Sequence, residues 1–118
     1  MFLRSSLRYF TTSRMVSSQV KDKVQQLIKS KPVFIASKTY CPYCAATKKT
    51  IEQITSDAYI IELDEESDGA EIQEALLELT GQRTVPNVFI AGEHIGGNSD
   101  VQALKSEDKL DDKIKAAL

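Results

Sequence analysis

Two cysteines, Cys41 and Cys44, are the only thiols in the 118-residue chain, and two residues separate them. A thiolate is the nucleophile of disulfide exchange, so one sulfur of such a pair can attack a disulfide and the other can release the product. Residues 32–36 before the pair are apolar and rich in β-branched side chains, which predicts a buried strand. Residues 45–54 after it favour a helix, and Pro42 suits the first turn because its missing N–H costs nothing there. A dithiol between a strand and a helix predicts redox chemistry.

The two thiols are expected to differ in acidity. Cys41 would lie at the helix N-terminus, where unpaired N–H groups and the helix dipole stabilise an anion. Lys38 would add a positive charge nearby. Because both effects lower a thiol pKa, Cys41 is predicted to be the attacking cysteine. Cys44 lies one helical turn further along, and we expect it to be shielded, to have a higher pKa and to resolve a disulfide formed at Cys41.

A zinc site and a structural disulfide are the alternative interpretations of this pair. A structural zinc site needs four ligands, and His94 is the only histidine available beside the two cysteines. Zinc would therefore require an intermolecular site, and no metal is expected. A disulfide that closes so short a loop would add little stability. Disulfide-stapled secreted domains of this size also use more than two cysteines.

Residues 1–19 differ in composition from the rest of the chain. They hold three arginines and no acidic residue, and apolar side chains fall on one helical face at Leu3, Leu7 and Phe10. Such an acid-poor amphipathic segment is typical of a mitochondrial transit peptide. The alternative is an N-terminal extension without an address function. Translation from Met15 would give a cytosolic form, so we expect a mitochondrial and/or cytoplasmic localisation.

Residues 20–118 are predicted to form one domain without internal repeats or linkers. They contain 12 basic and 17 acidic residues, and an acidic domain without a basic patch argues against nucleic-acid binding. No apolar run is long enough to span a bilayer, so no membrane association is expected. Nothing in the pattern indicates an obligate interface, and we expect a monomer.

Hydrophobic periodicity in this domain predicts alternating helices and strands, and hence an α/β fold. Helices are expected over residues 20–30, from 42 to about 55, over 70–79, from within 96–100 to about 104, and over 107–118. Strands are expected over residues 32–36, 58–63, 87–91 and 94–96. The first two strands should pair in parallel through a right-handed crossover, and the last two should form an antiparallel hairpin.

Three further predictions concern single positions at or near these elements. Gly81 fits the position after the helix over 70–79, where a left-handed conformation closes the last turn. Ser99 or Asn98 is predicted to be the N-cap of the next helix. His94 is interpreted as a strand residue that faces solvent and has no catalytic role.

Three segments resemble the signatures of dithiol glutaredoxins. They are Lys-Thr-Tyr-Cys-Pro-Tyr-Cys at 38–44, Thr-Val-Pro at 84–86 and Gly-Gly-Asn-Ser-Asp at 96–100. The resemblance covers residues 20–118 and is greatest to fungal members. It implies a thioredoxin-like (glutaredoxin) fold, with a four-stranded mixed sheet flanked by helices. A thioredoxin would carry Trp-Cys-Gly-Pro-Cys, whereas this chain has no tryptophan, and a monothiol glutaredoxin would have serine in place of Cys44.

The same resemblance implies a glutathione site. The Val85 backbone would lie opposite Cys41, before a cis Pro86, where the extended tripeptide can pair like an added strand. Ser99 and Asp100 would offer backbone N–H groups to the γ-glutamyl carboxylate, and the Asp100 carboxylate would meet the ammonium.

Four further positions follow from this resemblance. They are Lys38 and Gln73 near the glycine carboxylate, Tyr43 as a wall of the groove, and Arg83 as a nearby positive charge. The structural alternatives are that Lys38 is an ordinary solvated lysine, that Gln73 is an ordinary helix-surface residue, and that Ser99 and Asp100 only cap a helix. The combination of these residues beside the dithiol favours glutathione.

The predicted function is glutathione-dependent reduction of protein–glutathione mixed disulfides and protein disulfides, with Cys41 as nucleophile and Cys44 as resolving thiol. The expected partners are glutathione, glutathionylated and disulfide-containing proteins, and glutathione reductase indirectly through the glutathione pool. One alternative is an iron–sulfur carrier that holds a cluster with glutathione at a dimer interface. Pro42 argues against it, since by resemblance relatives with proline there usually hold no cluster. A thioredoxin-like reductase fed by a flavoenzyme is a weaker alternative, against which Ser99 and Asp100 argue.

Overall fold

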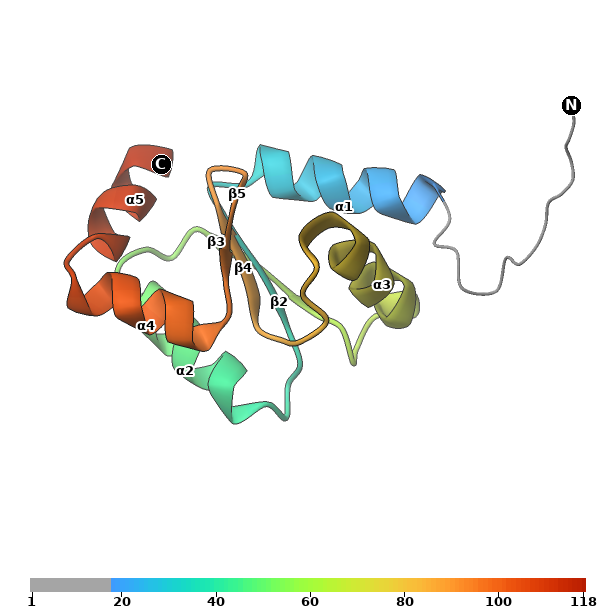
Figure 1. Cartoon of the computed structure of the whole chain (residues 1–118), viewed down its shortest axis with the longest axis horizontal. Coiled ribbons are helices and arrows are strands. Elements are labelled where there is room, and N and C mark those ends of the chain that lie inside the picture. Colours follow the sequence, from blue (N-terminus) through green and yellow to red (C-terminus); the bar gives the residue numbers. More distant parts are fainter. Residues whose placement is uncertain (1–17) are drawn as a thin grey trace, which may run out of the picture.

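The computed structural model describes residues 18–118, which form a four-stranded sheet with helices on both faces (Figure 1). The helices are α1 (Ser18–Ser30), α2 (Pro42–Glu52), α3 (Gly69–Thr80), α4 (Asn98–Ser106) and α5 (Leu110–Ala117). The strands are β2 (Val33–Ser37), β3 (Ala58–Glu62), β4 (Asn87–Ile90) and β5 (Glu93–Gly96). None of the helices in this part of the chain has the length and apolar character needed to cross a membrane. Nearly all of the predicted transit peptide, Met15 included, lies outside the described residues, so that interpretation stays a prediction.

The sheet is mixed, with the strand order β3-β2-β4-β5. Strand β2 pairs in parallel with β3, which places Phe34 opposite Tyr59, and antiparallel with β4, which places Phe34 opposite Phe89. Strand β5 returns antiparallel to β4, with a register shift between Val88 and Phe89. The parallel pair, the hairpin and the four-stranded mixed sheet are thus confirmed.

Side chains alternate between the two faces of the sheet and build a hydrophobic core on each. Phe34 and Ala36 of β2 point into the core that α1 and α3 cover, together with Phe89 of β4. Val33 and Ile35 point into the opposite core, which α2, α4 and α5 cover. Figure 1 shows this division, with α1 and α3 on one side of the strands and the other three helices on the other side.

The end of α3 agrees with the prediction, whereas the start of α4 differs from it. Gly81 closes α3 in the left-handed conformation, with φ of 79°, and its N–H donates to the Leu77 carbonyl at 2.7 Å. The N-cap of α4 is Gly97, so the prediction of Ser99 or Asn98 was wrong. The reason lies in Asp100, whose carboxylate reaches back and accepts the Gly97 N–H at 3.0 Å, which starts the helix earlier.

His94 on β5 is exposed, as predicted, but its ring is engaged. The ring packs on Phe89 with a centroid separation of 5.1 Å, and Nε2 lies 2.8 Å from the Asn87 side-chain oxygen. Partial burial lowers the pKa of His94. The sequence does not predict this contact because it depends on which residue of β4 lies beside the ring.

The start of α3 packs directly on the backbone that follows β3. A Cβ added at Gly69 would lie 1.9 Å from the Leu63 carbonyl oxygen. We therefore expect Gly69→Ala to lower the free energy of unfolding by about 1–3 kcal/mol, because the helix must move to relieve the overlap. Chemical denaturation measures this change. The control is Ala70→Ser, an exposed site in the same turn, where a change within about 0.5 kcal/mol is expected. Equal stability of the two variants would contradict the close packing.

Candidate active site

Cys41 is the N-cap of α2, with extended backbone angles of φ −90° and ψ 117°. Its sulfur accepts the Cys44 backbone N–H at 3.4 Å, one of the N–H groups that a helix start leaves unpaired. The two thiols are reduced and differ in access, since Cys41 is partly exposed whereas Cys44 is fully buried. One sulfur can therefore be reached by a disulfide and the other only from inside the site.

The surroundings shift the pKa values of the two thiols in opposite directions. Burial alone would raise the pKa of Cys41, but hydrogen bonds from the Cys44 N–H, the Cys44 thiol and the Tyr43 N–H, together with the charge of Lys48, lower it overall. Burial raises the pKa of Cys44, and the neighbouring Cys41 raises it further. At neutral pH the exposed sulfur is thus the better thiolate, which is the form that attacks disulfides.

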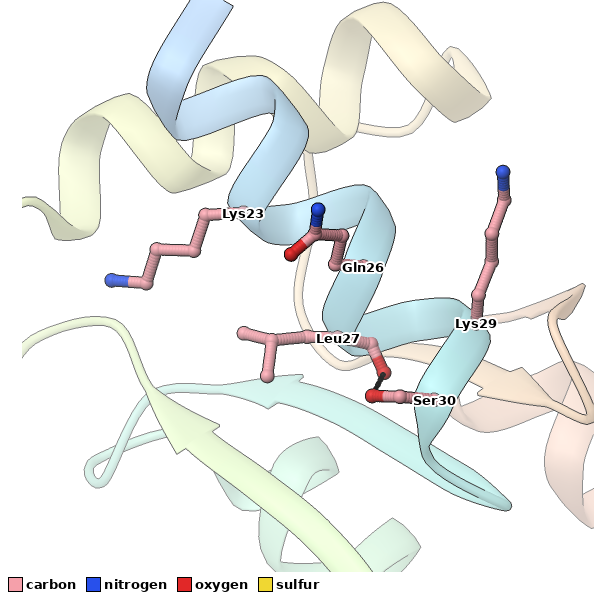
Figure 2. A pocket seen from close by; sticks show the side chains of 5 residues that line it. All are labelled: Lys23, Gln26, Leu27, Lys29 and Ser30. Atoms are coloured by element: carbon pink, nitrogen blue, oxygen red, sulfur yellow. Dashed lines mark hydrogen bonds between the residues drawn. The ribbon is translucent and has the colours of Figure 1, made fainter.

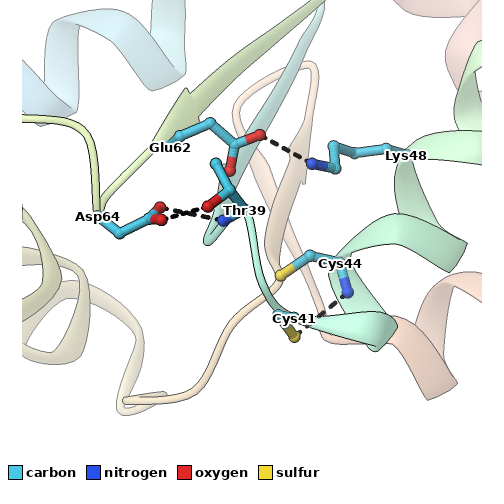
Figure 3. A network of polar contacts seen from close by, with 6 residues as sticks. All are labelled: Thr39, Cys41, Cys44, Lys48, Glu62 and Asp64. Carbon is cyan, nitrogen blue, oxygen red and sulfur yellow. Dashed lines mark hydrogen bonds and ion pairs between the residues drawn. The ribbon is translucent and has the colours of Figure 1, made fainter.

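A lysine that the sequence interpretation missed supplies the largest charge effect at Cys41. Lys48 lies one helical turn after Cys44 and forms an ion pair with Glu62 of β3 at 2.8 Å (Figure 3). The two side chains are only 21% and 20% exposed. The hydrogen bond to Glu62 raises the pKa of Lys48 and keeps it charged. The sequence pointed instead to Lys38, although the four-residue spacing from Cys44 to Lys48 was a usable signal.

The loop before Cys41 is fastened to the end of β3. The Thr39 N–H donates to one carboxylate oxygen of Asp64 at 3.0 Å, and the Thr39 hydroxyl donates to the other (Figure 3). These hydrogen bonds lower the pKa of Asp64. The Cys41 N–H then closes a turn on the Lys38 carbonyl at 3.1 Å. The position of the nucleophilic sulfur is therefore set from the sheet as well as from the helix.

Residues 82–86 face the dithiol from the other side. The Cys41 thiol points at the Val85 carbonyl, with sulfur and oxygen 3.9 Å apart, and the Val85–Pro86 peptide bond is cis, as the resemblance implied. Gln73, predicted to lie near the glycine carboxylate, contacts Arg83, predicted to be a nearby positive charge, since the Gln73 amide donates to the Arg83 carbonyl at 2.7 Å. This contact fastens the loop to α3.

The first turn of α4 forms the next wall. Asp100 accepts the Gly97 N–H, and a Cβ at Gly96 would lie 2.2 Å from that carboxylate oxygen, in a backbone conformation of φ +125° that favours glycine. Ser99 and Asp100 are exposed. The Thr47 hydroxyl donates to the Asn98 side-chain oxygen at 2.8 Å, which ties this wall to α2.

These segments enclose a groove of about 460 Å³, within the range of small-molecule sites. It is lined by Tyr43, Thr84, Val85, Pro86, Gly97, Asn98 and Ser99. Among the residues predicted for glutathione, the structure thus gathers Tyr43, Val85, Pro86 and Ser99, with Asp100 adjacent. Lys38 and Gln73 are not among the lining residues. Thr84, Gly97 and Asn98 lie within two matched signatures but were not assigned to the site.

A second hollow, of about 580 Å³, lies over α1 (Figure 2). Its lining residues are Lys23, Gln26, Leu27, Lys29 and Ser30. They bring no thiol to it. Across residues 18–118, no group of three or more His, Cys, Asp or Glu side chains is arranged to hold a metal ion. The chemistry of the described region therefore centres on the groove beside Cys41.

Comparison with known proteins identifies close relatives of this site and fold. The glutaredoxin family model matches residues 33–95. Glutaredoxin-C6 of Oryza sativa subsp. japonica is 56% identical over 88 residues, which cover 75% of this chain and 79% of that protein. Glutaredoxin-1 of Saccharomyces cerevisiae is 44% identical over 108 residues, covering 88% of this chain and 98% of that one. A crystal structure of a buckwheat glutaredoxin–glutathione complex has a TM-score of 0.81 and 48% identity, covering 84% and 90% of the two chains.

Because the pKa values of the two thiols shift in opposite directions, their alkylation rates should depend differently on pH. In Cys44→Ser, the rate of Cys41 alkylation by iodoacetamide should rise with a midpoint below the free-thiol pKa of about 8.5. In Cys41→Ser, the midpoint for Cys44 should lie above that value, because burial disfavours its thiolate. Mass spectrometry under native conditions measures both rates, and the unfolded variants provide the reference. Coincident midpoints in the folded variants would refute the assignment.

Proposed function

The chain belongs to the glutaredoxin family and is a glutathione-dependent thiol-disulfide oxidoreductase, and from this premise we propose how its residues carry the reaction. The observation that carries the proposal is the Cys41 sulfur itself. It is partly exposed, accepts a helix N-terminal N–H at 3.4 Å, has a lowered pKa and lies 3.9 Å from the Val85 carbonyl oxygen. A nucleophile beside the backbone carbonyl of a loop suits a disulfide that is carried on a short peptide.

The first half of the reaction removes glutathione from a protein. The Cys41 thiolate attacks the glutathione sulfur of a protein–glutathione mixed disulfide, a new sulfur–sulfur bond forms at Cys41, and the protein thiolate leaves and takes up a proton. A second glutathione, as its thiolate, then attacks the sulfur of the bound glutathione. The products are oxidised glutathione and the Cys41 thiolate, so electrons and sulfur bonds balance over the cycle.

Protein disulfides take a second route that uses both cysteines. Cys41 first forms a mixed disulfide with the substrate protein, and the Cys44 thiolate then attacks the Cys41 sulfur. The reduced protein leaves and a Cys41–Cys44 disulfide remains, which two glutathiones reduce. Cys44 is buried with a raised pKa, which supports a role confined to this intramolecular step.

Glutathione binding in the groove is supported by the chemistry of its walls. We assign the Val85 backbone to the peptide part of glutathione, and the N–H groups of Ser99 and Asp100 to the γ-glutamyl carboxylate. The Asp100 carboxylate meets the ammonium. Lys38, which takes part in none of the ion pairs among residues 18–118, reaches the glycine carboxylate.

Tyr43 and Gln73 have secondary parts in this assignment. Tyr43, exposed at 66%, walls the groove beside Pro86. The Gln73 amide N–H is engaged by Arg83, which leaves its oxygen and second N–H for the rim of the site.

The partners of this cycle follow from its chemistry. They are glutathionylated and disulfide-containing proteins, with glutathione reductase regenerating the glutathione pool, and the protein acts as a monomer. The family comparisons give no specific support to the alternative function of an iron–sulfur carrier.

Variants of the two cysteines test the mechanism. The assay is turnover of a glutathione–β-mercaptoethanol mixed disulfide, coupled to glutathione reductase. We expect Cys44→Ser to retain deglutathionylation, because the first route does not use Cys44. Cys41→Ser should fall by at least about a thousandfold, as expected when a covalent nucleophile is removed. Turnover by Cys41→Ser at the wild-type rate would eliminate the assignment. A brown protein after anaerobic purification, with no turnover, would favour the carrier.

We also propose that residues 1–19 direct the protein to mitochondria, with a cytosolic form translated from Met15. The support is the acid-poor, arginine-containing composition of the segment. A fluorescent protein fused behind residues 1–19 should accumulate in mitochondria of a fungal host. The control fusion carries glutamate at Arg4, Arg8 and Arg14 and should remain cytosolic, because import signals require the basic face. Cytosolic fluorescence from both fusions would contradict the targeting role.

A further inference from the structure

Gln82 lies behind the wall of the groove that faces the nucleophile. Its side-chain amide donates to the Thr84 carbonyl and to the Pro86 carbonyl, each at 3.0 Å. These two carbonyls flank Val85, whose own carbonyl faces the Cys41 sulfur on the other side. The amide therefore holds the backbone on both sides of the residue whose carbonyl faces Cys41.

Gln82 is itself fixed in place by α3. Its backbone N–H donates to the Thr80 hydroxyl at 3.0 Å, and that hydroxyl donates to the Leu76 carbonyl at 2.7 Å within the helix. The residue is half-buried. Its amide nitrogen would lie 3.8 Å from a methyl group placed on Gly97, so it sits where the 82–86 wall meets the start of α4.

We propose that Gln82 is a positioning residue for glutathione recognition, acting through the backbone of Val85. A glutamine amide carries two N–H donors, one for each flanking carbonyl. With both bonds made, the orientation of the Val85 N–H and C=O toward a bound peptide is fixed in advance. Without them, the segment must be ordered at the moment of binding, which weakens affinity. This inference rests on the proposed glutathione site and assigns no part in the sulfur chemistry to Gln82.

The test replaces Gln82 with glutamate, which has the same shape but only accepts hydrogen bonds when ionised. With a glutathionylated peptide as substrate, we expect Gln82→Glu to raise KM about tenfold and to leave kcat within about twofold, the size expected for two lost hydrogen bonds. The matched control is Gln26→Glu on α1, which makes the same chemical change at an exposed site over the second hollow (Figure 2). The control should match the wild type.

Two further measurements separate positioning from general damage. The rate of Cys41 alkylation by iodoacetamide, which needs no groove, should be the same in Gln82→Glu and the wild type. Gln82→Lys restores donors and should recover KM to within about threefold of the wild type. An unchanged KM in Gln82→Glu would overturn the inference, as would equal losses in KM, kcat and alkylation rate. An inactive wild type would instead overturn the proposed function, and the inference with it.

Discussion

A sulfur anion held at the start of a helix is the constraint on which the rest of the structure depends. Positioning Cys41 requires some burial, and burial opposes ionisation of a thiol. The N–H groups at the start of α2 offset that cost, because they are unpaired donors that point at the sulfur. Lys48 adds charge from the same helix and is itself held by Glu62 on the sheet. The loop between β2 and α2 therefore connects the two elements and also holds Cys41 where its thiolate is stabilised.

The groove beside the sulfur is built from parts that belong to different sides of the sheet. Helix α4 is tied to α2 through Asn98, which accepts a hydrogen bond from Thr47, and through Gln102, which donates one to Thr50. Residues 82–86 are fastened instead to α3, on the opposite face, through Gln73. The sheet joins these two assemblies, and its strand β4 leads directly from Pro86 into the core.

The sequence was sufficient to predict the helices and strands and the family. Hydrophobic periodicity and the three short signatures are local properties of the sequence. It predicted that Cys41 and Cys44 differ in acidity, but it named Lys38 where the structure gives the larger charge effect to Lys48. That difference depends on the partner strand, since only the placement of Glu62 fixes the lysine side chain. The N-cap of α4 moved to Gly97 for a similar reason, as the Asp100 side chain reaches back. Gln82 carried no signal, because its role exists only once the backbone around Val85 has folded.

The attachment of the two groove walls to opposite faces of the sheet gives each wall a hydrophobic core of its own. Changes in the core under α2, α4 and α5 act on the nucleophile and the first turn of α4 together. Changes in the core under α1 and α3 act on residues 82–86, where Val85 packs against that core. During evolution, the thiol peptide that the protein accepts can therefore change while the reactive sulfur stays the same. Protein design can likewise change selectivity without changing the reactivity of Cys41.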